Sequence, residues 1–327
     1  MATVFAFLSL FLALLALRPA HAAPIDCPPA AAAEAPSAQA LARMAREATE
    51  HGVLWRMERQ GRVSYLYGTL HVGRREWAMP GPSLRAALAA TDVLAMELDL
   101  LDPATLQALQ QGLAQAQRPV LPEPLAQRLA RQITQSCAPA GSLDGLHPVM
   151  QVTTLTLLEA LRDGLDGGYG QETVLAGFAH ARHRPIVALE TAAEQLAVML
   201  PATDEEAVTA VEDGLSQLER GVARALMRRL ANAWAEGRLD ELERYAEWCE
   251  CTDTPEQRAQ LARELDGRNA QMAQRIDALH RSGRQVLAAV GTLHMTGEQG
   301  LPRLMRSLGY RVERVMPAGA TTHRATR

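Results

Sequence analysis

The chain is poor in several features that mark particular protein classes. Aromatic residues make up only 4% of its 327 residues, and its net charge is −4 without a basic block. This charge balance argues against binding nucleic acid through neutralisation of phosphates. Hydrophobic residues make up 48% and charged residues 21%, which is typical of a folded globular protein and not of a disordered chain. Alanine and leucine are abundant and favour helices.

An apolar run covers residues 4–17 and is too short for a membrane span, which needs about 20 residues. Ala-His-Ala at residues 20–22 follows it and has the A-x-A form of a cleavage site. The sequence therefore predicts a signal peptide at residues 1–22. It also predicts a periplasmic or secreted location without membrane attachment after cleavage. The alternative is an uncleaved anchor, because the three residues "MAT" that start the chain carry no Arg or Lys.

The four cysteines are Cys27, Cys137, Cys249 and Cys251. An exported chain is free to form disulfides, and four cysteines allow three pairings. Because a bridge between Cys249 and Cys251 would close a very tight ring, we expect each of them to pair elsewhere. A cysteine–zinc site is disfavoured, since the cysteines lack CxxC spacing.

Strand patterns alternate with helical patterns near both ends of the chain. A Pro- and Ala-rich lead-in with a short helix occupies residues 23–50, and a hairpin around Gln60 and Gly61 follows. Further strands are expected at 93–98, 184–190 and 284–294 and close to residue 314, with helical blocks at about 103–164 and 203–275. This order predicts an α/β fold with a central, largely parallel sheet flanked by helices, a helical insertion in the middle of the chain and a flexible tail at 317–327.

The quartet Gly-Thr-Leu-His occurs twice, at residues 68–71 and 291–294, and each copy follows an apolar strand-like run. Glycine permits close backbone approach at a strand end, and histidine is a common metal ligand and acid/base group. Because reactive groups of open parallel sheets collect at the carboxyl ends of strands, we expect His71 and His294 to converge if their strands are neighbours. Glu97 ends the next predicted strand. The three residues would either bind a divalent cation or form a general base with its orienting groups.

The paired Gly-x-x-His motifs resemble the TraB/GumN family, whose animal relatives are the Tiki proteases that cleave Wnt proteins. The resemblance extends to "VLAMELDL", "GQETVLAGFAHARHRPIVALETAAEQL", "GRNAQMAQRI" and "VLAAVGTLHMTGEQGLPRLMRSLGYRVERV", and so covers most of residues 53–316. The family is similar in turn to erythromycin esterases and the haem-binding protein ChaN. The resemblance implies a single domain at residues 51–316.

The resemblance also implies roles for individual residues. It assigns the catalytic centre to His71, Glu97, His294 and Arg268, the metal to His71, Glu97 and His294, and substrate binding to Gly68, Gly291, Glu190 and Asn269. Gln195 belongs to the same "LET…Q" segment as Glu190. One departure is visible, because Glu172 stands where the family usually has Asp. A purely structural reading remains for Arg268, which can pair with Glu264 on the same helix.

Three functions follow as expectations. The first is an exported metal-dependent hydrolase, a peptidase acting on peptide or protein, with Mn, Co or Zn held by His71, Glu97 and His294. The second is a metal-independent hydrolase of the esterase type, in which His71 is the general base and Glu97 orients it. The third is a binding or signalling-shutdown module without turnover. The sequence leaves the oligomeric state open.

Overall fold

The computed structural model of the protein describes Cys27 and residues 38–316. The predicted signal peptide and the predicted tail lie outside the described residues. Within the described part of the chain, none of the helices combines the length and apolar character that a membrane-spanning segment requires. The short helix expected in the lead-in is present as α2, Ala38–Glu47.

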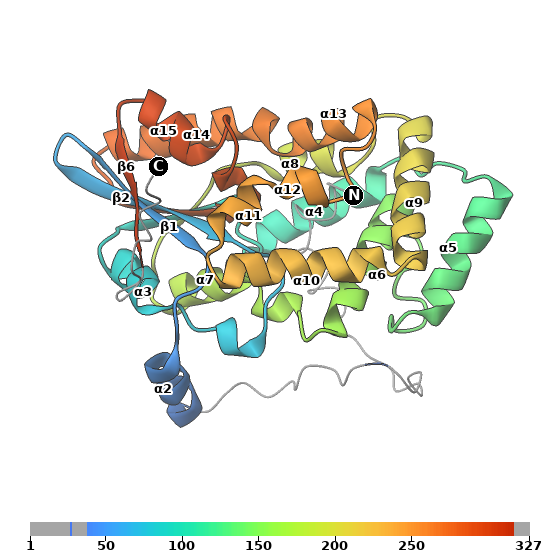
Figure 1. The fold of residues 1–327 in the computed structure, drawn as a ribbon, viewed down its shortest axis with the longest axis horizontal. Helices are drawn as coiled ribbons and strands as arrows, with labels where there is room; N and C mark the ends of the chain where they lie inside the picture. The colour runs from blue at the N-terminus through green and yellow to red at the C-terminus, as the bar shows by residue number, and fades with distance from the viewer. Residues whose placement is uncertain (1–26, 28–37, 317–327) are drawn as a thin grey trace, which may run out of the picture.

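A mixed sheet of six strands forms one end of the molecule (Figure 1). The strand order is β4-β3-β5-β2-β1-β6, and the neighbours from β4 to β2 are parallel. The strands are β1 (Val53–Arg59), β2 (Arg62–Thr69), β3 (Val93–Met96), β4 (Ile186–Ala188), β5 (Val286–Gly291) and β6 (Arg311–Arg314). This confirms the α/β class and the largely parallel sheet.

The antiparallel part of the sheet comes from the predicted hairpin. β1 pairs with β2 around a turn in which Gln60 has φ 52° and Gly61 has φ 73°. Two consecutive left-handed residues give a turn whose twist matches that of the paired strands. β6 then adds antiparallel to β1 at the edge of the sheet.

Helices make up most of the remaining chain, and several begin with proline, which is suited to the first helical turn. The helices are α3 (Pro82–Ala89), α4 (Pro103–Gln115), α5 (Glu123–Gln135), α6 (Pro148–Leu161), α7 (Gln171–Ala181), α8 (Ala192–Met199), α9 (Asp204–Glu219), α10 (Val222–Ala235), α11 (Leu239–Glu243), α12 (Tyr245–Trp248), α13 (Pro255–Glu264), α14 (Asp266–Arg281) and α15 (Leu301–Ser307). Short 3₁₀ helices are η2 (Arg75–Trp77), η3 (Gly167–Tyr169) and η4 (Thr292–Met295). The expected strand at 284–294 therefore ends at Gly291, and Thr-Leu-His turns into η4.

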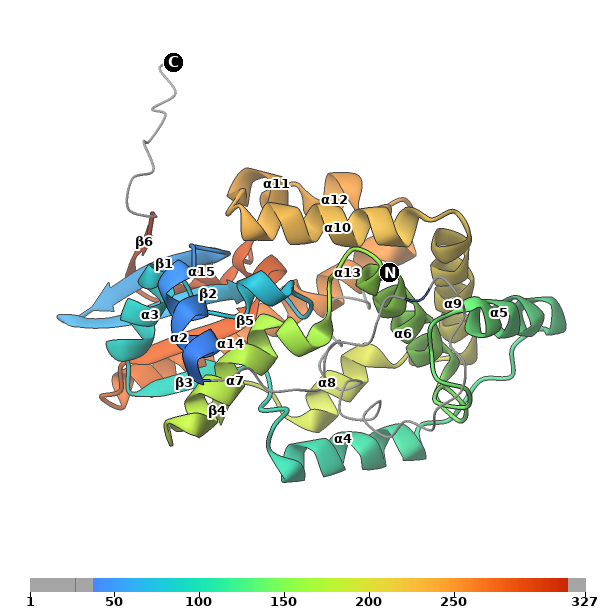
Figure 2. The ribbon, with the colours of Figure 1, turned by 90° about the horizontal axis from the view of Figure 1, so that it is seen from below.

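The described part of the molecule has two apolar cores. The larger core surrounds the sheet and takes buried side chains from α7, α10 and α14, such as Leu175, Leu230 and Ile276. The second core lies among α4, α5, α6, α8 and α9, with Leu109, Val152 and Leu215 at its centre. Figure 2 shows these helices gathered at the end of the molecule opposite the sheet. The helical lobe contains the first predicted insertion and the start of the second.

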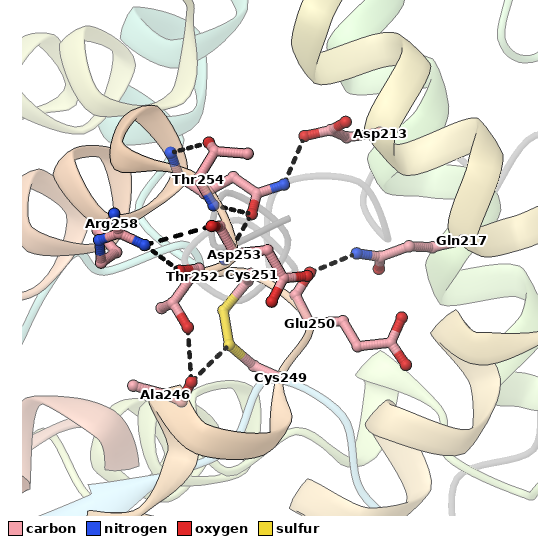
Figure 3. The surroundings of a disulfide bond; sticks show 11 residues. Asp213, Gln217, Ala246, Cys249, Glu250, Cys251, Thr252, Asp253, Thr254 and Arg258 are labelled. Atoms are coloured by element: carbon pink, nitrogen blue, oxygen red, sulfur yellow. Dashed lines mark hydrogen bonds between the residues drawn. A yellow bond between two sulfur atoms is a disulfide. The ribbon is translucent and has the colours of Figure 1, made fainter.

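The disulfides differ from the sequence-based expectation. Cys249 and Cys251 bond to each other, so the prediction that each pairs elsewhere was wrong (Figure 3). The tight ring closes because Glu250 between them takes a left-handed conformation, φ 50°, which brings the two Cα atoms to 5.1 Å. That separation lies in the ordinary range for a disulfide. The other pair, Cys27–Cys137, joins the lead-in to the segment after α5, and it also differs from the expectation, under which Cys27 and Cys137 would pair with Cys249 and Cys251.

Replacing Gly68 by alanine tests how tightly the two motif strands pack. A Cβ at this position would lie 2.7 Å from Thr292 Oγ1 and 2.9 Å from Val53 Cγ2, so the strands would have to shift. We expect Gly68→Ala to lower the free energy of unfolding by about 1–3 kcal/mol in urea denaturation. Gly177→Ala is the matched control, because a Cβ there meets nothing within 4 Å and helix α7 gains about 0.5–1 kcal/mol. Equal stability of Gly68→Ala and the wild type would contradict the close packing.

Candidate functional site

The carboxyl ends of the four parallel strands, β2, β3, β4 and β5, lie at one edge of the sheet. His71 follows β2, Glu97 follows β3, Glu190 follows β4 and His294 lies in η4 just after β5. The register brings Thr69 opposite Gly291, and the amide of Glu190 donates to the carbonyl of Glu97 at 3.0 Å. Because these strands are parallel, the two motif histidines and the glutamates that follow β3 and β4 lie at the same edge.

A pocket opens at this edge, with a cavity volume of about 30 Å³. This is room for a water molecule or a small group. His71, Glu97, Arg268, Gly291 and His294 all line it. His71, Glu97 and His294 come from the ends of their strands, whereas Arg268 comes from helix α14. The complete lining is Thr69, Leu70, His71, Glu97, Leu230, Leu261, Glu264, Leu265, Arg268, Gly291, Thr292, Leu293 and His294.

Gly291 marks the point where the two histidines and Glu97 approach one another. A Cβ on this residue would lie 3.3 Å from Glu97 Oε1, 3.5 Å from His294 Cδ2 and 4.0 Å from His71 Nε2. Its amide also donates to Glu97 Oε1 at 2.8 Å. A methyl group would press on the Glu97 carboxylate, so glycine keeps open the space between the three functional groups. The two motif glycines therefore serve different ends, since Gly68 allows strand packing and Gly291 leaves the pocket open.

Arg268 connects the groups behind the pocket. Its Nε donates to Glu190 Oε1 at 2.8 Å, and its Nη2 donates to Glu97 Oε2 at 2.6 Å and to Glu190 Oε2. Its Nη1 donates to the carbonyl of Glu264 at 3.1 Å and to His294 Nε2 at 3.2 Å. A guanidinium has five N–H groups, and all five have an acceptor here. Arg268 thus pairs with Glu97 and Glu190, and it donates to the backbone carbonyl of Glu264.

Both carboxylates are buried, and their pKa values move in opposite directions. Burial alone would raise the pKa of Glu97, but Arg268, the two histidines and the Gly291 amide bring it well below its ordinary value. Burial raises the pKa of Glu190, and Arg268 only partly offsets this while the charge of Glu97 adds to it. Gln195 bridges the pair, since its Nε2 donates to Glu97 Oε2 at 3.1 Å and to Glu190 Oε2 at 2.8 Å. Glu97 therefore remains a carboxylate, and Glu190 is the member of the pair that protonates more easily.

His294 is held neutral with one defined tautomer. Because Arg268 can only donate, His294 Nε2 accepts, and Nδ1 carries the proton that Asn269 Oδ1 accepts at 2.7 Å. Burial and then the charge of Arg268 lower the pKa of His294 to about 3. The side chain is fixed from both sides, so it does not exchange protons near neutral pH.

His71 has the opposite electrostatic setting. Its Nδ1 lies 3.2 Å from Glu172 Oε1, and both side chains are buried. Burial lowers the pKa of His71, but the charge and hydrogen bond of Glu172, together with Glu97, raise it above its ordinary value overall. Glu172 reaches this position because the amide of Gln171 donates to the carbonyl of Leu70 at 2.9 Å, which docks the start of α7 beside the motif. Thr69 also donates its hydroxyl to Glu172.

The donor groups do not fit a divalent cation as they are arranged. Glu97 Oε1 and His294 Nε2 are 3.8 Å apart, but Nε2 accepts from Arg268 and both oxygens of Glu97 accept N–H groups. A cation between them would lie next to a guanidinium that already neutralises the carboxylates. Among the described residues, no group of three or more His, Cys, Asp or Glu is placed to hold a metal ion. The expected metal therefore stays a prediction.

The remaining predicted residues lie behind the pocket and support it. Gly68 accepts a hydrogen bond from the Trp234 indole at 2.7 Å, Glu190 holds Arg268 and Asn269 holds His294. None of Gly68, Glu190 and Asn269 lines the pocket. Sequence reasoning did not identify the contact of Glu172 with His71, although its place in the family pattern was a signal. It also did not identify the pocket wall formed by Leu230, Leu261 and Leu265, since leucines at helical spacing are ordinary core residues.

The neutral state of His294 predicts a pH dependence of stability. His294 takes up a proton in the unfolded chain below its ordinary pKa of 6.5, but in the folded chain only near pH 3. Its contribution is present above about pH 6.5 and is lost as the pH falls toward 3, by up to roughly 1.4 kcal/mol per pH unit. We expect the wild type to lose free energy of unfolding more steeply than His294→Gln in urea titrations from pH 7.5 to 4.5. Parallel profiles of the two proteins would show that His294 titrates normally.

The chain has recognisable relatives. A model of the TraB/PrgY/gumN family matches residues 53–314. The uncharacterized protein YbaP of Shigella flexneri is 26% identical over 255 residues, which are 75% of this chain and 88% of the relative. The uncharacterized protein YbaP of Escherichia coli (strain K12) is 25% identical over 252 residues, which are 74% and 87% of the two chains. No solved structure matches the chain significantly. The matched range contains both Gly-x-x-His motifs and also Glu97, Glu190 and Arg268. The chain belongs to the TraB/PrgY/gumN family.

Proposed function

We propose that the protein is a hydrolase in which His71 is the general base and Glu172 orients it. The observation that carries this proposal is the buried contact of 3.2 Å between His71 Nδ1 and the Glu172 carboxylate, beside a pocket with room for water. A histidine whose Nδ1–H is held by a carboxylate presents Nε2 as the base. Glu172 takes the orienting role that the sequence suggested for Glu97.

The reaction that this arrangement supports is attack of water on a carbonyl carbon. His71 takes a proton from the water as the new C–O bond forms, and Glu172 stabilises the resulting imidazolium. The same proton then passes to the leaving nitrogen or oxygen as the old bond breaks. Arg268 acts as a positioning residue for Glu97 and His294, because none of its five N–H groups is left for an oxyanion. The similarity to the Tiki proteases supports a peptide bond as the target.

Metal-dependent hydrolysis is the second candidate. It is favoured by the neutral state of His294, because neutral imidazole is the form that binds metals. It requires Arg268 to release both Glu97 and His294.

The predicted signal peptide supports a periplasmic or secreted location. Such a location would in turn support a peptide or protein substrate outside the cytoplasm.

Hydrolysis of a peptide library and of p-nitrophenyl esters tests the proposed function. We expect turnover that survives a chelator and falls about 10²–10⁴-fold in His71→Ala, because the base is lost. His180→Ala is the control, since His180 is exposed and pairs with Asp99 at the surface. Activity that appears only after loading Mn, Co or Zn would favour the metal-dependent candidate. If purified protein cleaves nothing that His71→Ala leaves intact, a binding module without turnover becomes the better description.

The pH profile of Glu172→Gln tests the orienting role. In the wild type, activity should rise with pH through the raised pKa of His71, above its ordinary 6.5, because the neutral form is the base. Without the charge of Glu172, burial dominates and lowers the pKa of His71. We expect this limb of the profile to move to lower pH and the maximal rate to fall at least about tenfold. Asp99→Asn should leave the limb in place, and an unmoved limb in Glu172→Gln would rule out the pairing.

A further inference from the structure

The turn before helix α7 packs closely against the segment that follows the first motif. The amide of Gly73 donates to the carbonyl of Asp166 at 2.9 Å, and the amide of Asp166 donates back to the carbonyl of Gly73 at 2.8 Å. At the other end of the contact, the amide of Gln171 donates to the carbonyl of Leu70 at 2.9 Å. The two segments therefore run side by side in opposite directions, and backbone hydrogen bonds hold both ends of the contact.

Two glycines allow this close approach. A Cβ on Gly170 would lie 2.3 Å from the carbonyl oxygen of His71, and a Cβ on Gly73 would lie 2.2 Å from the carbonyl oxygen of Tyr169. Both distances are far below van der Waals contact, and the opposing atoms belong to the backbone, so a side chain would force the two segments apart. Gly170 has φ −57° and ψ 143°, which other residues also adopt, so the lack of space and not the backbone conformation requires glycine here.

Gln171 fixes the same turn through its side chain. This side chain is buried, with 1% exposure, and its Nε2 donates to the carbonyl of Trp77 at 3.1 Å. Trp77 lies in η2, shortly after the first motif, so Gln171 is held there by its side chain as well as by its amide. Gln171 is the first residue of α7 and Glu172 is the second. The anchored turn therefore determines where the backbone of Glu172 lies.

The carboxylate of Glu172 depends on this docking. Its Oε1 lies 3.2 Å from His71 Nδ1 and accepts the hydroxyl of Thr69, whereas its Oε2 is buried and has no hydrogen-bond partner among the described residues. Both contacts that hold the carboxylate thus come from the first motif. Because a carboxylate only accepts, the contact places the imidazole proton of His71 on Nδ1. A displacement of α7 by about 1 Å would break a hydrogen bond of this length.

We propose that Gly170 and Gln171 are positioning residues of the reaction, because they hold Glu172 in place. Held there, Glu172 keeps the proton of His71 on Nδ1 and makes Nε2 the base. This inference rests on the proposed function, in which His71 is the general base. Neither Gly170 nor Gln171 lines the pocket, so each acts through Glu172 and not by touching the substrate. Gly170 provides the space for the close approach, and Gln171 provides the bond to Trp77.

The tautomer of His71 tests this positioning without any substrate. It can be read from NMR spectra of protein labelled at the histidine nitrogens, at a pH where His71 is neutral, with the signals assigned by their loss in His71→Ala. We expect the wild type to carry the proton on Nδ1. Gly170→Ala should give a mixture of both tautomers, because the start of α7 moves away from the motif.

Gly81→Ala is the matched control for this measurement. Gly81 also directly precedes a helix, α3, and its Cβ would lie 2.6 Å from the carbonyl oxygen of Thr49, but it does not line the pocket. We expect Gly81→Ala to disturb its own helix start and to keep the wild-type tautomer of His71. A wild-type tautomer in folded Gly170→Ala would overturn the proposal.

Kinetics on a cleaved substrate separate positioning from a purely structural role. We expect Gly170→Ala to lower kcat about tenfold with KM unchanged, since the base is misoriented while the pocket keeps its lining. In a Glu172→Ala background, Gly170→Ala should cause no further loss, because the contact with His71 is already absent. An equal loss of kcat in both backgrounds would show that Gly170 only supports the fold, and it would overturn the proposal.

Gln171→Met tests the second positioning residue and also serves if Gly170→Ala does not fold. Methionine keeps the length of the side chain and the backbone amide, but it removes the donor to the carbonyl of Trp77. We expect the same change of tautomer as in Gly170→Ala and a smaller fall in kcat. A folded Gln171→Met protein with the wild-type tautomer and the wild-type kcat would contradict the proposal.

The positioning and the hydrolase fail in distinguishable ways. A changed tautomer in these variants, without hydrolysis of any peptide or ester by the wild type, would support the positioning and count against the hydrolase. Hydrolysis by the wild type, together with an unchanged tautomer in both variants, would support the hydrolase and overturn the positioning.

Discussion

The buried guanidinium of Arg268 is the interaction on which the rest of the site depends. It holds two carboxylates that follow different strands, one histidine that follows a third, and the end of α13. Removing one partner from a buried ion pair leaves an uncompensated charge, at a cost of about 3–5 kcal/mol. The cluster therefore ties the integrity of the sheet edge to the geometry of the pocket, and the same bonds contribute to folding and to the site.

The two histidines are treated differently although they belong to the same quartet. His294 faces a cation and becomes a fixed neutral group, whereas His71 faces a carboxylate and retains the capacity to exchange a proton. Such separation of pKa values between neighbouring titratable groups is a usual way to assign chemical roles. The repeated sequence thus produces two equivalent positions at neighbouring strand ends, and the surrounding residues decide what each position does.

Much of the sheet could be predicted from the sequence, because its strands carry strong local signals. Gln60-Gly61 identified the hairpin, and the alternation of strands with helices identified the parallel part. The meeting of His71, Glu97 and His294 also followed from the rule that parallel strands end at a common edge. The pairing of Cys249 with Cys251 was not predictable, because it depends on one left-handed residue, Glu250. The full engagement of Arg268 was likewise hidden, since its partners lie 78 and 171 positions away in the chain.

The bond between Cys27 and Cys137 has a consequence for where this fold is most stable. It closes a loop spanning 110 positions, and in the chain-entropy account a loop of this length stabilises the folded state by about 4–5 kcal/mol. That contribution exists only while the thiols are oxidised, and glutathione and thioredoxin keep them reduced in the cytosol. The folded protein is therefore more stable against unfolding in an oxidising compartment, and protein produced under reducing conditions has a lower free energy of unfolding.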